Sequence, residues 1–185
     1  MLRYHPDELD RFLREVDREL AEPVTIIIIG GAAVAMGYGS KRPTKDIDLW
    51  TNPDKPFWEA VERVRLRTGI FIPVNPTPEA DPPEGFEERL QPYSLDGMAR
   101  LRVYLPERHD LVMMKTARGE TPDIEAILDI HAQQPLELDV LIQRYPEMMP
   151  MGPPSRFRLR FLAMIAAVFG EPVAEDVERQ LPPLK

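Results

Sequence analysis

The sequence predicts an α+β protein with a small mixed sheet, helices on one face of that sheet, and a helical C-terminal portion. Segment 24–29 is a continuous β-branched apolar run, typical of a strand buried on both faces. Segment 44–51 alternates acidic and apolar residues with the period of a strand. Elsewhere apolar residues recur at helical spacings of three and four. Strands and helices therefore share the first part of the chain, and helices alone fill the last part.

The first elements follow directly from these patterns. An apolar stripe of Leu9, Phe12, Leu13, Val16 and Leu20 predicts a helix over 6–21. After the strand at 24–29, Gly30 and Gly31 break the extended run, and the small apolar segment 32–36 predicts the start of a tightly packed helix. A loop at 37–40, the strand within 44–51 and an amphipathic helix at 56–67 complete this part.

The second half is predicted to begin with a loop or flap at 73–85, which is rich in proline, glycine and acidic residues. Two strands, 89–94 and 99–105, flank Asp96-Gly97, a common hairpin turn. Helices are expected at 109–117, 121–132 (with Thr121 as N-cap), 136–145 and 156–169, followed by a frayed tail. We expect a core domain over residues 1–132 and a helical extension over 133–185 packed on it.

Composition excludes several classes of protein. The 185 residues include no cysteine, which excludes disulfides and thiolate zinc sites. No apolar run approaches the roughly 20 residues of a membrane span, and the first residues lack the apolar core of a signal peptide. We therefore expect a cytoplasmic protein. The net charge of -8 argues against a general nucleic-acid binder. Basic clusters at 41–45, 63–67 and 156–160 are either solvated surfaces or local contacts for an anion.

The residues that indicate chemistry lie between 26 and 49. A buried strand ends in Gly30-Gly31, where glycine lets the backbone approach a phosphate, and a helix follows whose N-terminus favours anions. Asp46 and Asp48 then lie two residues apart on a strand, so their side chains share one face. Two carboxylates on one face suit Mg²⁺, which takes one or two carboxylates together with phosphate oxygens. Taken singly, the glycines also fit a tight turn and the acids a solvated strand face.

The segment IGGAAVAMGYGSKRPTKDIDL resembles the signature of the polymerase-β-like nucleotidyltransferases, in which a glycine pair precedes an Asp-x-Asp motif. It is most similar to the AbiEii/AbiGii-type toxin branch and its relatives. The resemblance implies a nucleotidyltransferase fold, catalytic roles for Asp46, Asp48 and Lys115, and Mg²⁺ or Mn²⁺ on Asp46 and Asp48. It also implies nucleotide-binding roles for Gly30, Gly31, Ser40, Arg42, Thr44, Lys45 and Asp123. Read from the residues alone, Lys115 also fits a surface lysine, and Asp123 a helix-capping acid.

These expectations lead to a hypothesis and an alternative. The hypothesis is a Mg²⁺-dependent enzyme that moves a nucleoside monophosphate from a nucleoside triphosphate to an acceptor hydroxyl. The acceptor would be an RNA end such as tRNA, a protein or a small molecule, and a toxin–antitoxin setting would add a cognate antitoxin as partner. The alternative is a non-catalytic nucleotide- or partner-binding module, because many relatives carry a third acid on a later strand and the expected strand 101–105 has none. A third reading makes Asp46 and Asp48 purely structural.

Overall fold

The structure is a computed structural model that describes residues 2–76 and 80–182. The chain forms two compact units, Met1–Pro78 with Leu90–Pro106, and Glu79–Arg89 with Glu107–Lys185. The domain boundary expected after residue 132 lies inside the second unit, and that division of the chain stays a prediction.

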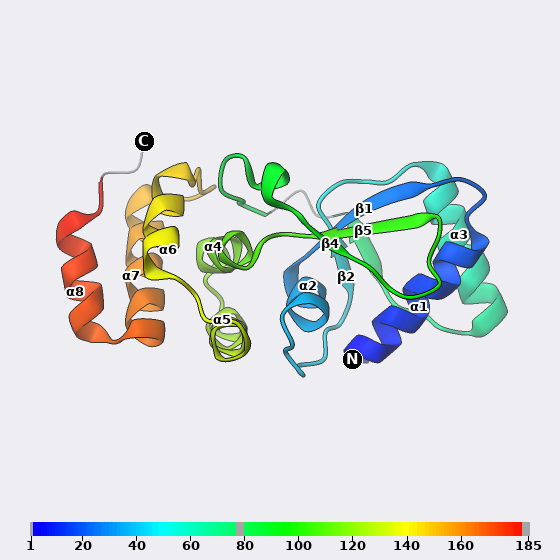
Figure 1. The fold of residues 1–185 in the computed structure, drawn as a ribbon, viewed down its shortest axis with the longest axis horizontal. Coiled ribbons are helices and arrows are strands. Elements are labelled where there is room, and N and C mark those ends of the chain that lie inside the picture. The colour runs from blue at the N-terminus through cyan, green and yellow to red at the C-terminus, as the bar shows by residue number, and fades with distance from the viewer. Residues whose placement is uncertain (1, 77–79, 183–185) are drawn as a thin grey trace. The chain divides into compact units, whose positions relative to one another are not determined.

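The first unit is built on a five-stranded mixed sheet with the strand order β3-β2-β1-β5-β4 (Figure 1). Its strands are β1 (Val24–Ile29), β2 (Ile47–Leu49), β3 (Val74–Pro76), β4 (Gln91–Tyr93) and β5 (Leu101–Leu105). The strand β1 pairs parallel with β5 and antiparallel with β2. The expected hairpin is confirmed, because β4 pairs antiparallel with β5. The predicted α+β class with a mixed sheet is therefore correct.

One face of this sheet is buried under helices. Along β5, Leu101, Val103 and Leu105 are buried while Arg102 is exposed, the alternation of a strand covered on one side. The helices of this unit are α1 (Pro6–Glu19), α2 (Gly30–Gly37) and α3 (Lys55–Thr68). The predicted apolar stripe of α1 is buried, and α1 and α2 lie on the same side of β1 and β5 (Figure 1). The opposite face, which carries Asp48, is more open.

The strand β3 corrects the loop expected over 73–85. Residues 74–76 pair parallel with β2, so that Asp48 is in register with Asn75. The helix α3 forms the crossover between these parallel strands, as parallel pairing requires. A 3₁₀ helix, η1 (Phe86–Arg89), lies in the same sequence region and belongs to the second unit. Residues 77–79 of the expected loop lie outside the described residues.

The second unit is helical. Its elements are α4 (Arg108–Arg118), α5 (Thr121–Gln133), α6 (Leu138–Arg144), the 3₁₀ helix η2 (Tyr145–Glu147), α7 (Pro154–Phe169) and α8 (Glu171–Gln180). The rings of Tyr145, Phe157 and Phe161 cluster, with centroids 4.8 to 6.2 Å apart, and form its aromatic core. Glu120, and not Thr121, is the N-cap of α5. The expected helical C-terminal portion is confirmed.

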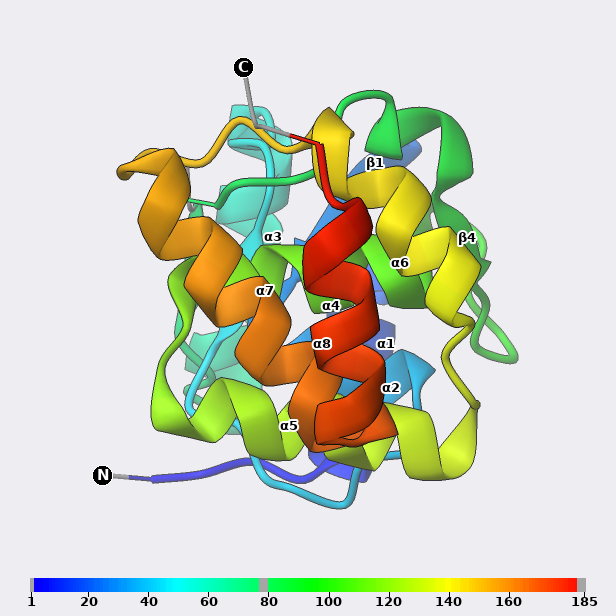
Figure 2. The ribbon, with the colours of Figure 1, turned by 90° about the vertical axis from the view of Figure 1, so that its left-hand side faces the viewer.

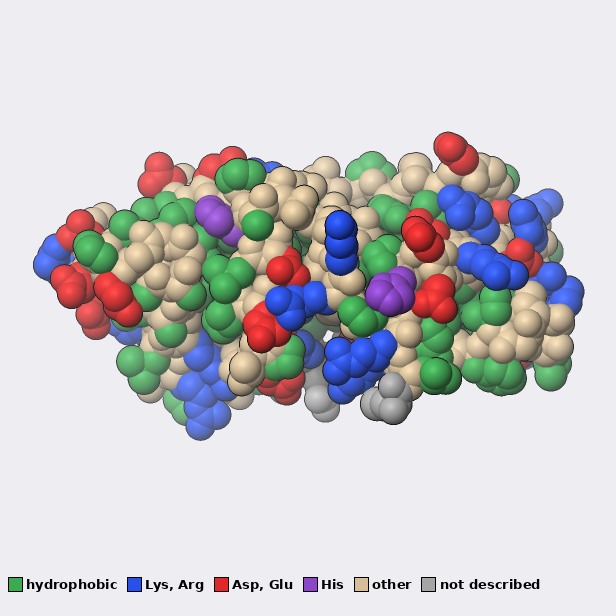
Figure 3. Space-filling view, turned by 90° about the horizontal axis from the view of Figure 1, so that it is seen from below, with side chains coloured by type: hydrophobic (Ala, Val, Ile, Leu, Met, Phe, Trp, Pro, Cys, Tyr) green, Lys and Arg blue, Asp and Glu red, His purple; other side chains and the backbone are tan. Residues whose placement is uncertain are grey.

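The helix α8 corrects the frayed tail expected after residue 169. Pro172 lies in its first turn, Ala174 and Val177 are buried, and α8 lies alongside α7 (Figure 2). Only two of its ten residues are buried, so its apolar stripe is narrow. Its exposed surface is acidic, with Glu171, Glu175, Asp176 and Glu178, and acidic side chains gather at the left end of Figure 3. Part of the negative net charge therefore lies on this helix.

None of the helices within the described residues is both long enough and apolar enough to cross a membrane.

Candidate functional site

The turn from β1 into α2 is the first component of the site. Gly30 adopts a φ of +69°, a left-handed conformation that residues with a side chain rarely take. A Cβ atom added to Gly30 would lie 2.9 Å from Asp48 Oδ2, and one added to Gly31 would lie 2.9 Å from Thr44 Oγ1. Both contacts are too short for a real Cβ. The two glycines therefore allow the start of α2 to approach the Asp48 carboxylate and the Thr44 hydroxyl.

The carboxylates come from the strand next to β1. Asp48 lies in the middle of β2 and is in register with Ile29, the residue before the glycine pair. Its neighbours Ile47 and Leu49 are buried on the opposite face, which fixes the direction of the Asp48 side chain. Asp46 directly precedes β2, and both carboxylates are partly exposed. The sheet register thus places Asp48 beside the β1–α2 turn.

An asparagine on β3 joins these carboxylates. Asn75 Nδ2 donates a hydrogen bond to Asp46 Oδ2 over 3.3 Å, while the Asn75 backbone is in register with Asp48. Asp46, Asp48 and Asn75 therefore form a cluster of oxygen-bearing side chains across β2 and β3. We name this the Asp-Asn cluster.

The loop before β2 contains the other predicted nucleotide-binding residues. The backbone of Thr44 pairs with that of Tyr4, and its hydroxyl donates to the Asp46 carbonyl over 3.2 Å. Ser40 is buried, and its hydroxyl accepts a hydrogen bond from the Arg42 backbone N–H. The side chains of Arg42 and Lys45 are exposed. Thr44 and Ser40 thus hold the loop, while Arg42 and Lys45 give its surface a positive charge.

The side chains of the Asp-Asn cluster are of a kind that could hold a magnesium ion. Carboxylate and amide oxygens are hard ligands that suit Mg²⁺, and a site of one or two carboxylates is completed by water and phosphate oxygens. In the part of the chain that the structure describes, no group of three or more His, Asp or Glu side chains is arranged to hold a metal ion. The donors fit a cation that shares its coordination with a ligand, and they do not form a closed metal cage.

Lys115 and Asp123 lie in the second unit, away from the protein surface. The Lys115 side chain is only 5% exposed, and its Nζ lies 3.2 Å from Asp123 Oδ1. Arg118 makes two further contacts with the same carboxylate, of 2.9 and 2.5 Å. Burial alone would raise the pKa of Asp123, but the Arg118 hydrogen bonds and the charges of Lys115 and Arg118 outweigh it and lower that pKa.

Asp123 also caps its own helix, because its Oδ2 accepts the backbone N–H of Glu120 over 3.1 Å. The capping reading of Asp123 is therefore correct, and the exposed-surface reading of Lys115 is wrong. The roles of both residues toward a nucleotide stay predictions.

Comparison with known protein families gives one match. A family model described as "Nucleotidyltransferase of unknown function (DUF6036)" matches residues 7–164. This chain belongs to that nucleotidyltransferase family. Comparisons with curated proteins and with solved structures found no match. The match extends over parts of both units and contains every residue of the candidate site. The closer resemblance to the AbiEii branch stays a prediction.

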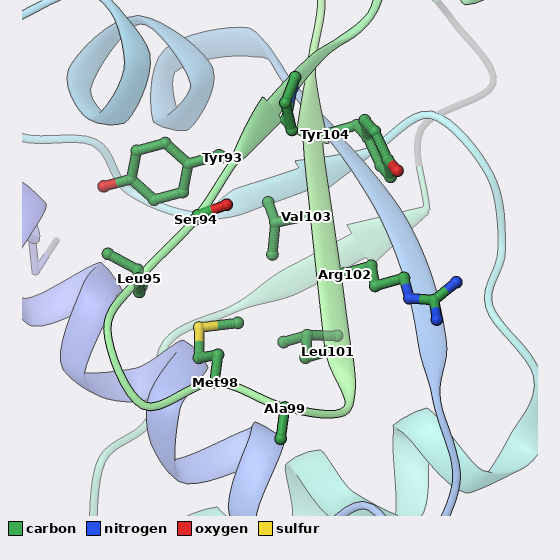
Figure 4. Close-up of a pocket in the computed structure, with 10 residues that line it drawn as sticks. Tyr93, Ser94, Leu95, Met98, Ala99, Leu101, Arg102, Val103 and Tyr104 are labelled. Carbon is green, nitrogen blue, oxygen red and sulfur yellow. The ribbon is translucent and has the colours of Figure 1, made fainter.

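The β4–β5 hairpin of this nucleotidyltransferase contains a hollow of about 190 Å³. The side chains of Met98, Leu101 and Val103 point toward it, while Arg102 points to the other side of β5 (Figure 4). Asp46, Asp48 and Asn75 do not line it. The hollow is therefore separate from the Asp-Asn cluster, and its lining offers few charged groups for a nucleotide.

Asn75 is the site residue of this nucleotidyltransferase that sequence reasoning missed. It lies in a three-residue strand inside a segment dominated by prolines, where the turn signal hid the extended pattern. The available clue was the apolar residues Ile70, Phe71, Ile72 and Val74 directly before it, which are compatible with a strand reaching the sheet. The strand β5, where the third acid was expected, lies on the other side of β1 from β2.

Proposed function

We propose that this protein transfers a nucleoside monophosphate from a nucleoside triphosphate to an acceptor hydroxyl, with a divalent cation held at Asp46 and Asp48. One observation carries the proposal: the Asp48 carboxylate lies directly against Gly30, since a Cβ atom at that position would be only 2.9 Å from Asp48 Oδ2. A cation on this carboxylate would therefore be adjacent to the backbone at the start of α2. Cation and backbone N–H groups would then bind the same phosphate chain.

Each residue of the first unit has a distinct task in this proposal. Asp46 and Asp48 would hold Mg²⁺ or Mn²⁺, which would supply neutralisation of the phosphate charge. The N–H groups at the start of α2 would orient the phosphates, with the helix dipole favouring their negative charge. The exposed charges of Arg42 and Lys45 would attract the triphosphate to the site.

The transfer needs little covalent chemistry from the protein. The acceptor oxygen attacks the α-phosphorus in line, the bond from that phosphorus to the bridging oxygen of the leaving group breaks, and pyrophosphate leaves. The hydroxyl proton passes to solvent. Positioning and charge neutralisation supply most of the rate acceleration in such reactions.

The alternative is a module that binds nucleotide without turning it over. The binding-module alternative is favoured by Asn75, the residue on β3 that lies beside the two carboxylates. An acid at this position could act as a base, but the amide of Asn75 cannot. The strand β5, Leu101–Leu105, has no acidic residue either. The two proposals differ in a single observable, the release of pyrophosphate.

The test incubates the full chain with each α-³²P-labelled triphosphate, Mg²⁺, and total cellular RNA and protein. The matched control is the double variant Asp46→Asn/Asp48→Asn, which removes two charges and keeps the side-chain shapes. Label that moves to a macromolecule only with the native chain supports the enzyme, and the labelled species identifies the acceptor class. Retention of labelled nucleotide without transfer supports the binding module. Equal behaviour of native chain and control overturns both.

The acceptor and the cellular role stay predictions. An RNA end, a protein and a small molecule are all compatible with the partly exposed Asp-Asn cluster. The labelled species in this experiment distinguishes the first two, and a small-molecule acceptor is tested by adding the low-molecular-weight fraction of a cell extract and measuring pyrophosphate release. The toxin–antitoxin setting, with an antitoxin as partner, rests on the resemblance to the AbiEii branch alone.

A further inference from the structure

The inference concerns Asn75 and rests on the proposed function. Asn75 occupies the position on β3 that is in register with Asp48, and its amide nitrogen lies 3.3 Å from Asp46 Oδ2. An ionised acid at this position could not donate to Asp46, and would instead add a third negative charge next to it. The amide at position 75 therefore has two consequences for Asp46. Asp46 accepts a hydrogen bond from it, and Asp46 has no negatively charged side chain at that position to repel it.

The charge of the cluster decides how strongly it binds a cation alone. Sites of otherwise similar geometry gain affinity as the number of ligand charges rises. With Asn75 in place, the cluster offers two negative charges. No third His, Asp or Glu side chain within the described residues is placed to join it as a metal ligand. Mg²⁺ gives up its water reluctantly, so a pair of partly exposed carboxylates is a weak site without phosphate oxygens.

We propose that Asn75 is a positioning residue that orients Asp46 and keeps the cluster at two charges, so that the cation binds together with the triphosphate rather than before it. The cation and the nucleotide are then coupled ligands: each raises the affinity for the other. Binding of the cation is thereby limited to the nucleotide-bound protein.

The experiment measures Mn²⁺ binding to the full chain by the electron paramagnetic resonance signal of free Mn²⁺. The variants are Asn75→Asp, which has the same shape and one more charge, and Asn75→Ala. The matched control is Asn52→Asp, which adds the same charge at the other asparagine of the chain. Asn52 is exposed, and its Oδ1 accepts a bond from Trp58 Nε1 over 3.0 Å, which an aspartate oxygen can also accept.

Native protein is expected to bind Mn²⁺ alone with a Kd of about 10⁻⁴ M or weaker, and Asn75→Asp on the order of tenfold more tightly. Asn52→Asp is expected to match the native protein. Without metal, Asn75→Asp should melt at a lower temperature because three carboxylates repel one another, and Mn²⁺ should restore its Tm. A Kd for Asn75→Asp within twofold of the native value overturns the proposal, as does micromolar binding of Mn²⁺ alone by the native protein.

A second measurement separates this proposal from the proposed function. Retention of each α-³²P-labelled triphosphate is measured by equilibrium dialysis with and without Mn²⁺. The proposal expects Mn²⁺ to increase retention by the native chain at least about tenfold, and expects a smaller increase for Asn75→Ala. If the native chain retains no nucleotide under any condition, the proposed function fails, whatever the Mn²⁺ titrations give. If nucleotide is retained equally with and without Mn²⁺, the coupling fails and a nucleotide site remains.

Asn75→Ala removes a side chain next to a short strand, and circular dichroism melts show whether it folds. The comparison of Asn75→Asp with Asn52→Asp needs no truncated variant. It therefore shows whether a third negative charge in the cluster raises the affinity for Mn²⁺, even if Asn75→Ala is unfolded.

Discussion

The carboxylate of Asp17, in α1, accepts a hydrogen bond of 2.6 Å from the backbone N–H of Leu101, the first residue of β5. The preceding N–H groups of Ala99 and Arg100 donate to the same carboxylate over 2.7 to 3.2 Å. The ladder between β4 and β5 reaches only as far as Tyr93 and Val103, so Leu101 has no partner on β4. Asp17 takes the place of that missing partner and ties α1 to the sheet.

Replacing Asp17 should therefore destabilise the first unit. Burial would raise the pKa of Asp17, but the backbone hydrogen bonds of Leu101, Arg100 and Ala99 outweigh it and lower the pKa. Asp17→Asn should lower the free energy of unfolding by about 2 kcal/mol at neutral pH, the typical size of hydrogen bonds to a charged group. Urea denaturation measures this loss. The exposed Asp96→Asn, in the same hairpin, should change it by less than about 0.5 kcal/mol.

The same lowered pKa sets the pH dependence of this contribution. A carboxyl whose pKa is lower in the folded state stabilises fully above its unfolded pKa of about 4, and the effect is lost as the pH falls through the folded value. The stability difference between the native chain and Asp17→Asn should thus be constant from pH 7 to about pH 5 and shrink below pH 4. A difference that grows on acidification would contradict this assignment.

Comparing Gly30→Ala with Gly69→Ala should distinguish the effect of backbone strain on stability from the effect of a changed site on nucleotide binding. Gly30 and Gly69 both have a positive φ, of 69° and 70°, so an alanine is strained at either position by about 1 kcal/mol. Only at Gly30 does the new Cβ meet a side chain, Asp48 Oδ2, whereas nothing lies within 4 Å of a Cβ at Gly69. Both variants should lose similar stability in thermal melts. Only Gly30→Ala should lose Mn²⁺-dependent nucleotide retention. Equal retention by the two variants would contradict the placement of Asp48 in the nucleotide site.

Asp123→Asn should destabilise the second unit strongly. The change leaves Lys115, which is 5% exposed, facing a neutral amide in place of its carboxylate. Removing one partner of a buried ion pair costs about 3 to 5 kcal/mol, because the other charge stays buried. Urea denaturation followed by circular dichroism measures the loss. The exposed Asp139→Asn, in the first turn of α6, removes the same charge and should cost less than about 1 kcal/mol. Similar losses for both variants would show that Lys115 finds another partner.

Asp110→Asn should expose the chain at Arg89 to trypsin. Arg89 binds the buried Asp110 through two contacts, of 2.8 and 3.0 Å, and Arg144 Nε lies 3.1 Å from the same carboxylate. These contacts hold segment 80–89 within the second unit. The neutral amide of asparagine cannot pair with two guanidinium groups, so cleavage after Arg89 should become severalfold faster than in the native chain. Mass spectrometry of the fragments identifies the cleavage site, and an unchanged rate would show that the segment is held by other contacts.

Part of the candidate site could be predicted from the sequence, and part could not. The residues around Gly30, Gly31, Asp46 and Asp48 predicted a strand that turns into a helix and a later acidic strand, and the structure has these elements. That the acidic strand lies beside the turn is a result of the pairing of β1 with β2. Asn75 could not be found in this way, because a three-residue strand carries almost no periodicity. Its position depends on the crossover through α3 and on pairing with β2, both of which are long-range. Likewise, the sequence did not show whether Lys115 is buried.

The sequence by itself determined which segments become strands and helices in most of the chain, since the apolar period follows from local geometry. It also determined the family, through a match that covers residues 7–164. Only the tertiary structure decided which strands are neighbours, and hence that Asn75 contacts Asp46 while β5 lies beyond β1. Strand order is set by the burial of a whole sheet face, a property of the folded unit that no single segment carries.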